Sequence, residues 1–253
     1  MLSQITPLIL TYNEAPNIER TLQKLTWAKR IVVIDSYSTD ETIELISTYP
    51  QADVFQRKFD THTNQWNYGL EQVDTDWVLS LDADYVLTDD LVNEMSYLFP
   101  PADVDGYFVS FQYCVFGKPL RGSILPPRQM LFRRGHSIYI DDGHTQLLSV
   151  ERESAFLKKT VLHDDRKPLS RWLWAQDRYM IIEAKKLLET NDTALSVSDR
   201  LRKLKLLAPL VVLVYCLILK GGVLDGWRGW YYAFQRMFAE ILLSLKLMEM
   251  TLP

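Results

Sequence analysis

Two aspartates separated by one residue, Asp82 and Asp84, directly follow the apolar segment 77–81. Carboxylate oxygens suit Mg²⁺ or Mn²⁺, and two of them on a loop that leaves a buried strand can approach the same ion. An ion held there would neutralise a diphosphate leaving group. A D-x-D tripeptide can also be a turn with two solvated acids, so the surrounding sequence has to decide between these interpretations.

The first 100 residues alternate apolar segments typical of strands with amphipathic segments typical of helices. Strands are predicted at 5–10, 30–35, 53–55 and 77–81, and helices at 16–25, through Ile43 and Ile46, at 62–73 and at 88–99. This alternation predicts an α/β fold with a mostly parallel sheet and helices on both of its faces. Ligands of such sheets bind beyond the carboxyl ends of the strands, where Asp35, Asp82 and Asp84 stand.

The pattern changes after Pro100. Apolar and polar residues alternate over 106–116, and short strands are predicted around 129–133, 137–140 and 146–150. This pattern predicts an antiparallel extension. We expect one domain over 1–198, with a first half at 1–100 and a second half at 101–198, followed by C-terminal membrane-associated helices at 199–253.

Charge and apolarity distinguish the C-terminal part. Residues 199–253 hold eight Lys or Arg and four Asp or Glu, whereas residues 1–198 hold 20 and 28. The net charge of −4 does not favour nucleic-acid binding, which usually needs a basic excess. The apolar run 206–219 is shorter than the about 20 residues that span a bilayer. We expect this part to lie on the membrane surface, with Arg200, Arg202, Lys203 and Lys205 at anionic head groups.

Cysteine usage and the N-terminal segment indicate the compartment. The two cysteines, Cys114 and Cys216, stand far apart in apolar settings, so neither a zinc site nor a disulfide framework is expected. Residues 1–13 hold no Lys or Arg, which is unlike a signal peptide. These features predict a cytoplasmic protein, peripheral or monotopic on the inner face of the cytoplasmic membrane.

Three segments carry a family resemblance. Residues 7–14 read PLILTYNE, residues 33–40 read VIDSYSTD, and residues 77–84 read WVLSLDAD. In this order they resemble the opening strand with its Asn-Glu turn, the nucleotide-binding strand end and the metal-binding D-x-D of family 2 glycosyltransferases with the GT-A fold. The resemblance implies an inverting hexosyltransferase that uses a nucleotide-sugar, and a divalent cofactor, Mn²⁺ or Mg²⁺. It also implies that residues 1–198 are the catalytic domain, with the nucleotide-sugar-binding half at 1–100 and the acceptor half, which contains the antiparallel extension, at 101–198.

Further segments are similar to a subgroup of β-glycosyltransferases that act on the lipopolysaccharide core. Gln65-Trp66-Asn67 resembles a Gln-Arg-Asn element, 161–163 resembles a His-containing segment, and 221–226 resembles a Gly-x-Leu-Asp-Gly turn between membrane-associated helices. By this resemblance the partners are a UDP-sugar donor, a lipid-linked or lipopolysaccharide acceptor, and a membrane surface.

The resemblance also implies roles for single residues. His163 is expected to join Asp82 and Asp84 as a metal ligand, although it can also be a hydrogen-bonded structural histidine. Asp35 can accept hydrogen bonds from the base or the ribose, or it can only form a turn. The predicted donor-binding residues are Thr11, Tyr12, Glu14, Asp35, Gln65, Asn67, Asp82, Ala83 and Asp84.

Inverting transfer needs a carboxylate that takes the proton of the acceptor hydroxyl. The subgroup carries a His-Glu pair, whereas residues 141–146 read DDGHTQ, without a Glu after His144. We predict Asp142 as the catalytic base and Asp141 as the runner-up, with a plain turn as the alternative. Four arginines of the antiparallel part can meet phosphates or stay solvated: Arg121, Arg128, Arg133 and Arg134.

Three other functions would require different sequence features. A sugar nucleotidylyltransferase would need a Gly-rich phosphate loop after the first strand, but residues 11–16 hold no glycine. A hydrolase with a nucleophile elbow would need Gly-x-Ser-x-Gly, which the sequence does not contain. A membrane-associated pseudoenzyme that binds UDP with weak or no transfer remains an alternative, because the expected Glu is missing.

Overall fold

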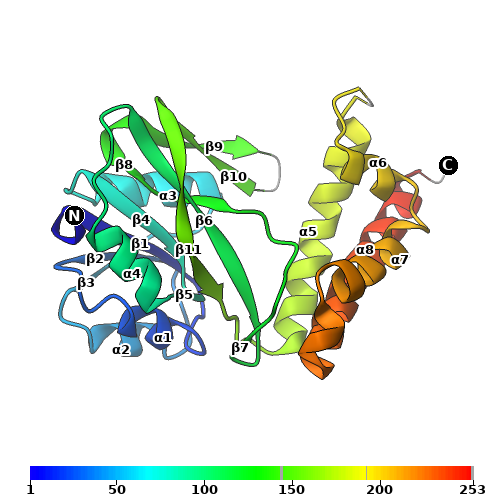
Figure 1. Ribbon diagram of the computed structural model, residues 1–253, viewed down its shortest axis with the longest axis horizontal. Coiled ribbons are helices and arrows are strands. Elements are labelled where there is room, and N and C mark those ends of the chain that lie inside the picture. Colours follow the sequence, from blue (N-terminus) through cyan, green and yellow to red (C-terminus); the bar gives the residue numbers. More distant parts are fainter. Residues whose placement is uncertain (143–144, 192, 252–253) are drawn as a thin grey trace. The chain divides into compact units, whose positions relative to one another are not determined.

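The computed structural model describes residues 1–142, 145–191 and 193–251, and it divides into two compact units. The first unit comprises Met1–Cys114 and Leu125–Arg166, and the second comprises Val115–Ile124 and Lys167–Pro253. The first unit holds the sheet, and the second is built from helices (Figure 1). The catalytic domain expected over 1–198 stays a prediction.

One large sheet forms the body of the first unit, with the strand order β3-β2-β1-β4-β8-β6-β11-β5. The four strands from β3 to β4 are parallel, β8 is antiparallel to both β4 and β6, and β11 runs parallel to β6 and antiparallel to β5. The sheet is therefore mixed, and the predicted parallel arrangement holds for its first four strands. The strands are β1 (Ile5–Thr11), β2 (Ile31–Asp35), β3 (Ala52–Gln56), β4 (Trp77–Asp82), β5 (Tyr85–Leu87), β6 (Val104–Val115), β8 (Arg128–Arg133) and β11 (Glu153–His163).

Three further strands are described. β9 (Ser137–Asp142) and β10 (Thr145–Val150) form a separate antiparallel pair, in which Tyr139 lies opposite Leu148. β7 (Lys118–Pro119) belongs to the second unit. The strands predicted around 137–140 and 146–150 correspond to β9 and β10, whereas β5 and β11 were not predicted.

Helices cover both faces of the parallel strands, because alternate residues of each strand face opposite sides. On one face, Ile9, Val33 and Leu79 pack in a cluster with residues of α1 (Ile18–Gln23) and α4 (Asp89–Ser96), and α2 (Thr42–Ser47) lies against α1. On the other face, Leu8 and Ile34 pack against α3 (His62–Glu71). These two clusters fix the strand ends on which the predicted site depends.

The second unit contains α5 (Leu169–Glu189), α6 (Val197–Lys203), α7 (Ala208–Val214) and α8 (Trp227–Thr251). α8 packs along α5 and α7 (Figure 1). A π-helical turn, Tyr215–Leu219, and a 3₁₀ turn, Gly222–Asp225, connect α7 to α8. A Cβ atom at Gly229 would lie 1.8 Å from the carbonyl oxygen of Gly222, so glycine is required where this connection meets α8.

None of the helices within the described ranges is both long and apolar enough to cross a bilayer. One basic residue expected at lipid head groups is placed differently. Arg202 lies between two helices, with Nη1 3.1 Å from a Glu183 carboxylate oxygen and Nη2 3.0 Å from one of Glu240. Glu240 is buried, so Arg202 neutralises a charge inside the second unit.

Candidate active site

The carboxyl ends of β1 and β2 lie side by side, with Thr11 opposite Asp35. Asp35 is completely buried. Its carboxylate accepts hydrogen bonds from Thr11 Oγ1 at 3.1 Å, from the Ser38 backbone N–H at 2.9 Å and from Gln56 Nε2 at 3.3 Å. Asp35 therefore organises the loop after β2, as a turn-forming aspartate would, at the place where the nucleotide is expected.

The loops after β1 and β2 are tied together by side-chain hydrogen bonds. The backbone N–H of Asn13 donates to Ser38 Oγ at 2.9 Å, and the backbone N–H of Thr39 donates to Asn13 Oδ1 at 2.8 Å. Asn13 and Tyr37 have φ angles of 54° and 61°, in the left-handed region that is unusual for an aromatic residue. Such backbone strain persists where surrounding contacts hold it and is common at functional sites. Tyr12 and Tyr37 are exposed.

Gln65 and Asn67 stand on α3 and hydrogen-bond to two different parts of the first unit. Gln65 is completely buried, donates through Nε2 to Ser36 Oγ at 2.9 Å and accepts from Arg57 Nη1 at 2.5 Å. Asn67 binds the backbone of Tyr139 on β9. Gln65 thus reaches the loop after β2, whereas Asn67 reaches the hairpin that contains the predicted base.

The D-x-D segment follows β4 and is held by its backbone. The buried hydroxyl of Thr21, on α1, donates to the carbonyl oxygen of Ala83 at 2.7 Å. The backbone N–H of Asp164 donates to the carbonyl oxygen of Asp84 at 3.0 Å. These two bonds fix the loop between β4 and β5 and bring the end of β11 beside it, where His163 lies opposite Tyr85.

His163 and Asp84 meet at this point, with His163 Nε2 3.1 Å from Asp84 Oδ2. Burial lowers the pKa of His163, but the charge and hydrogen bond of Asp84, with Asp82 and Asp165 nearby, outweigh it, so that the net shift is upward. The distance fits two adjacent ligands of one octahedral ion, which are about 3 Å apart for bonds of about 2.1 Å. An imidazole and a carboxylate are donors that Mn²⁺ accepts, so the residues fit the implied cofactor.

No group of three or more His, Cys, Asp or Glu that could hold a metal ion occurs among the described residues. Asp82 meets a cation instead, with Arg128 Nη1 3.4 Å from its Oδ2 and 3.1 Å from the Tyr85 hydroxyl. Two protein ligands are enough where phosphate oxygens of a substrate and water complete the shell, as is usual for Mg²⁺. The structure thus pairs Asp84 with His163 and places Arg128 beside Asp82.

A polar cluster around Asn17 was not predicted. Asn17 is completely buried and donates through Nδ2 to Glu14 at 2.8 Å and to Asp165 at 2.9 Å. Its Oδ1 accepts from the Arg166 backbone N–H at 2.8 Å, and Arg20 donates to the Asp164 carbonyl oxygen at 2.8 Å. The run of charged residues directly after His163 was the available signal. This cluster joins the predicted residue Glu14 to the segment that follows His163.

The two candidate bases lie at the end of β9. Asp141 is exposed and pairs with Gln146 across the hairpin. Asp142 is described through its backbone alone, and His144 lies outside the described residues.

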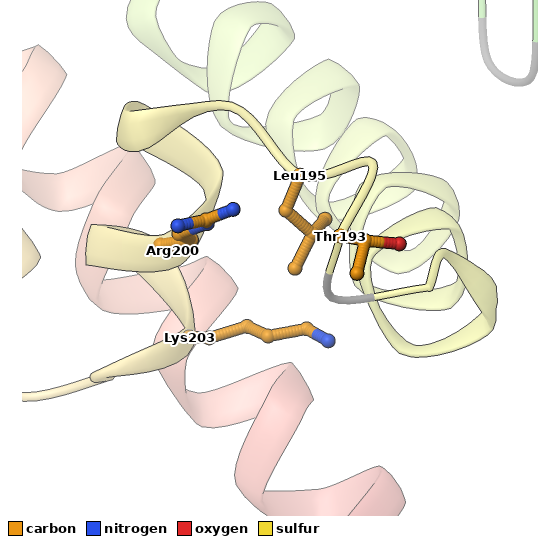
Figure 2. Close-up of a pocket in the computed structure, with 4 residues that line it drawn as sticks. All are labelled: Thr193, Leu195, Arg200 and Lys203. Carbon is orange, nitrogen blue, oxygen red and sulfur yellow. The ribbon is translucent and has the colours of Figure 1, made fainter.

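The structure contains an open hollow of about 410 Å³ in the second unit, lined by Thr193, Leu195, Arg200 and Lys203 (Figure 2). None of the predicted donor, metal or base residues lines it.

Residues 8–153 match the family described as glycosyl transferase family 2. The chain belongs to this family. An uncharacterized glycosyltransferase of Rickettsia bellii (strain RML369-C) is 32% identical over 105 residues, which are 41% of this chain and 35% of that protein. Poly-beta-1,6-N-acetyl-D-glucosamine synthase of Staphylococcus aureus (strain COL) is 33% identical over 97 residues, 35% of this chain and 24% of that protein. The match thus spans about a third or less of these relatives.

Solved structures resemble this glycosyltransferase in fold. Staphylococcus aureus TarS (residues 1–349) in complex with UDP-GlcNAc has a TM-score of 0.52 at 12% identity, covering 97% of this chain and 92% of that one. Glucosyl-3-phosphoglycerate synthase of Mycobacterium tuberculosis, in complex with Mn²⁺, UDP and phosphoglyceric acid, has a TM-score of 0.50 at 16% identity, covering 77% and 82%. The family 2 glycosyltransferase described here therefore has a GT-A-like α/β fold.

Proposed function

We propose that this family 2 glycosyltransferase moves a hexose from a UDP-sugar to a lipid-linked or lipopolysaccharide-core acceptor with inversion. The observation that carries the proposal is the pairing of Asp84 with His163 at the strand ends where the loops after β1 and β2 also meet. UDP-sugar and Mn²⁺ with UDP are present in the two structural neighbours named above, which supports the choice of donor and ion.

In the proposed mechanism, the loops after β1 and β2 bind the uridine, with Thr11, Tyr12, Glu14 and Asp35 around it. The exposed ring of Tyr12 offers a stacking surface for the base. Asp84 and His163 would hold Mn²⁺ or Mg²⁺, which when bound supplies positive charge to the UDP leaving group. Arg128, beside Asp82, adds a second positive charge for the diphosphate.

A carboxylate of β9 takes the proton of the acceptor hydroxyl. At the same time the hydroxyl oxygen attacks the anomeric carbon of the donor sugar, and UDP leaves. We place Asp141 before Asp142 as this base. Asp141 follows the inward-facing Tyr139 by two residues, and residues at i and i+2 of a strand share a face. Asp142 remains the alternative.

Thermal stabilisation and turnover test this function. UDP-, GDP- and TDP-hexoses are screened with Mn²⁺ or with a chelator, because a ligand that binds the folded state raises apparent stability. We expect stabilisation by UDP-hexoses that needs the metal, and UDP release that rises on addition of acceptor lipid. Stabilisation by UDP without acceptor-dependent release would support the pseudoenzyme instead, and no response to any nucleotide-sugar would refute both.

We also propose that the second unit attaches the enzyme to a membrane surface. Large apolar side chains of α7, the π-helical turn and α8 are exposed, among them Leu210, Val214, Ile218, Trp227 and Phe234. Two cations of the same unit, Arg200 and Lys203, line the open hollow (Figure 2), and cations near a membrane surface attract anionic head groups. A surface of this composition is typical of interfacial helices.

Removal of the C-terminal helices would uncover the face of α5 that packs on α8, so substitutions of exposed residues give a cleaner test. The combined variant Leu210→Ser, Val214→Ser and Ile218→Ser should lose co-sedimentation with vesicles of anionic phospholipid and keep its thermal stability. The control is Phe99→Ser, at a residue of the first unit that is 90% exposed. Unchanged sedimentation of the combined variant would contradict the membrane proposal.

A further inference from the structure

One side chain of α3 forms hydrogen bonds with both backbone polar groups of a residue on β9. Asn67 Nδ2 donates to the carbonyl oxygen of Tyr139 at 2.9 Å, and the backbone N–H of Tyr139 donates to Asn67 Oδ1 at 3.0 Å. The two residues are 72 positions apart in the chain. The amide of Asn67 therefore occupies the place that a peptide group of a neighbouring strand would take, since it offers one donor and one acceptor in a plane.

The side chain of Tyr139 is fixed by the residue before Asn67. Trp66 stacks on the Tyr139 ring, with centroids 5.3 Å apart and an interplanar angle of 21°. Phe132 contacts the same ring edge-on, and Tyr139 is buried. Burial raises the pKa of the Tyr139 phenol and outweighs the opposing effect of its hydrogen bond with the Ser80 side chain. Tyr139 therefore has its ring on Trp66 and its hydroxyl at Ser80.

Ser80 stands on β4, two residues before Asp82. Its contact with Tyr139 shows in which direction β9 runs relative to β4. Directly after β8 and three residues before β9, the backbone N–H of Arg134 donates to the carbonyl oxygen of Asp76, directly before β4, at 2.9 Å. The chain therefore approaches β9 from the start of β4, reaches Ser80 at Tyr139 and continues toward the D-x-D end. Asp141 shares the face of Tyr139, because side chains alternate along a strand.

The same turn of α3 also holds the nucleotide side of the predicted site. Gln65 binds Ser36 Oγ and the Arg57 carbonyl oxygen, at 2.9 and 3.0 Å. Three consecutive residues of one helix, Gln65, Trp66 and Asn67, therefore connect the loop after β2 with β9. Their spacing on a rigid helix sets how far β9 lies from the donor loop.

From these contacts we infer that Asn67 is a positioning residue, whose side-chain amide fixes the register of β9. The register in turn orients the Asp141 carboxylate toward the sugar donor. A slip of β9 by one residue would turn every side chain of the strand to its opposite face. The bidentate contact with the Tyr139 backbone prevents that slip. The inference rests on the proposed function for its catalytic consequence, whereas the register itself can be measured without substrate.

The experiment compares Asn67→Ala and Asn67→Asp with a matched control, Asn64→Ala. Asn64 lies one turn earlier on α3 and donates to Asp60 at 3.0 Å, away from β9. Asn67→Asp keeps the acceptor for the Tyr139 N–H and carries the test if the alanine variant does not fold. The readouts are amide hydrogen exchange of residues 137–141, UDP affinity with Mn²⁺, and kcat for transfer.

In Asn67→Ala we expect exchange over 137–141 to become about tenfold faster or more, as follows from the loss of two hydrogen bonds. We expect kcat to fall by about tenfold to a hundredfold, since a misplacement of about 1 Å can cost that much. UDP affinity should stay unchanged, and Asn67→Asp should give a smaller loss of kcat. Asn64→Ala should match the unmodified protein in all three readouts.

Two results would overturn the inference. If Asn67→Ala weakens UDP binding while β9 stays protected from hydrogen exchange, Asn67 is a donor-binding residue. If both the hydrogen exchange of β9 and kcat are unchanged in Asn67→Ala, the amide does not position β9. A different pattern separates it from the proposed function. If Asn67→Ala loosens β9 while Asp141→Asn retains full activity, the positioning of β9 is upheld and the assignment of the base is refuted.

Discussion

His163 Nε2 lies 3.1 Å from Asp84 Oδ2, although the two residues are 79 positions apart in the chain. Strand pairing produces this contact, because β11 runs beside β5 and places His163 opposite Tyr85, directly after Asp84. Asp82, the other carboxylate of the D-x-D segment, lies beside Arg128. The two aspartates therefore have different partners, and their substitution should have different effects.

Asp84→Asn should abolish transfer and leave the fold intact, with a smaller loss in Asp82→Asn. The loss of one anionic ligand removes several kcal/mol of charge stabilisation at the leaving group. kcat/KM is measured against Mn²⁺ concentration, and circular dichroism checks the fold. Asp89→Asn, at an exposed carboxylate paired with Lys24, serves as the control. Near-normal turnover of Asp84→Asn at limiting Mn²⁺ would show that Asp84 is no metal ligand.

Asp35→Ala should raise the donor KM more than it lowers kcat, and it should also destabilise the protein. The substitution leaves the buried hydroxyl of Thr11 without its acceptor, at about 1–3 kcal/mol for an unsatisfied buried group, and it removes the acceptor of the Ser38 backbone N–H and of the Gln56 side chain. Calorimetry with UDP and urea unfolding measure the two effects, with Asp53→Ala on β3 as the control. If UDP affinity is unchanged while stability falls, Asp35 acts as a turn residue alone.

Asp141→Asn should lower kcat by about 10²–10⁴-fold and spare UDP binding, as expected for loss of a general base. Asp142→Asn is the matched comparison, because it removes the neighbouring carboxylate. A large loss of kcat in Asp142→Asn with an active Asp141→Asn would reverse the assignment. Full activity in both variants would place the base outside this pair.

Arg202→Met should destabilise the second unit by about 1–3 kcal/mol, because it leaves the buried carboxylate of Glu240 without its partner. Binding to anionic vesicles should change little, since the Arg202 guanidinium is engaged with Glu183 and Glu240. Arg200→Met, at an exposed arginine of the same helix, is the comparison, because it should keep the stability of the second unit and weaken vesicle binding. A stable Arg202→Met variant that no longer binds vesicles would restore the lipid contact expected from the sequence.

Both cysteines should react slowly with thiol reagents in the folded protein. Burial raises the pKa of Cys114 to about 12, and it also raises the pKa of Cys216. The thiolate is the reactive form, so little of it is present at pH 8. A colorimetric thiol assay should detect two thiols in denaturant and react far more slowly without it. Rapid labelling of the folded protein would contradict the burial of these side chains.

Local periodicity explains which elements could be predicted. The apolar runs of β1, β2 and β4 predicted buried strands, and their polar ends predicted where the acids would gather. β5 has three residues, too few for a pattern, and β11 has irregular pairing with β6 between Phe156 and Thr160. That irregularity interrupts the two-residue alternation, so the sequence did not predict β11 or its parallel pairing with β6.

The sequence by itself determined the family, the D-x-D segment and the strand ends on which the predicted donor residues stand, because burial of short segments is encoded locally. The tertiary structure alone decided that Asp84 pairs with His163, that Arg128 joins Asp82, that Asn67 binds β9 and that Arg202 lies inside the helical unit. These contacts join residues that are distant in the chain, and they depend on which strands and helices become neighbours when the protein folds. That choice follows from the packing of the whole core on both faces of the sheet, which no local pattern records.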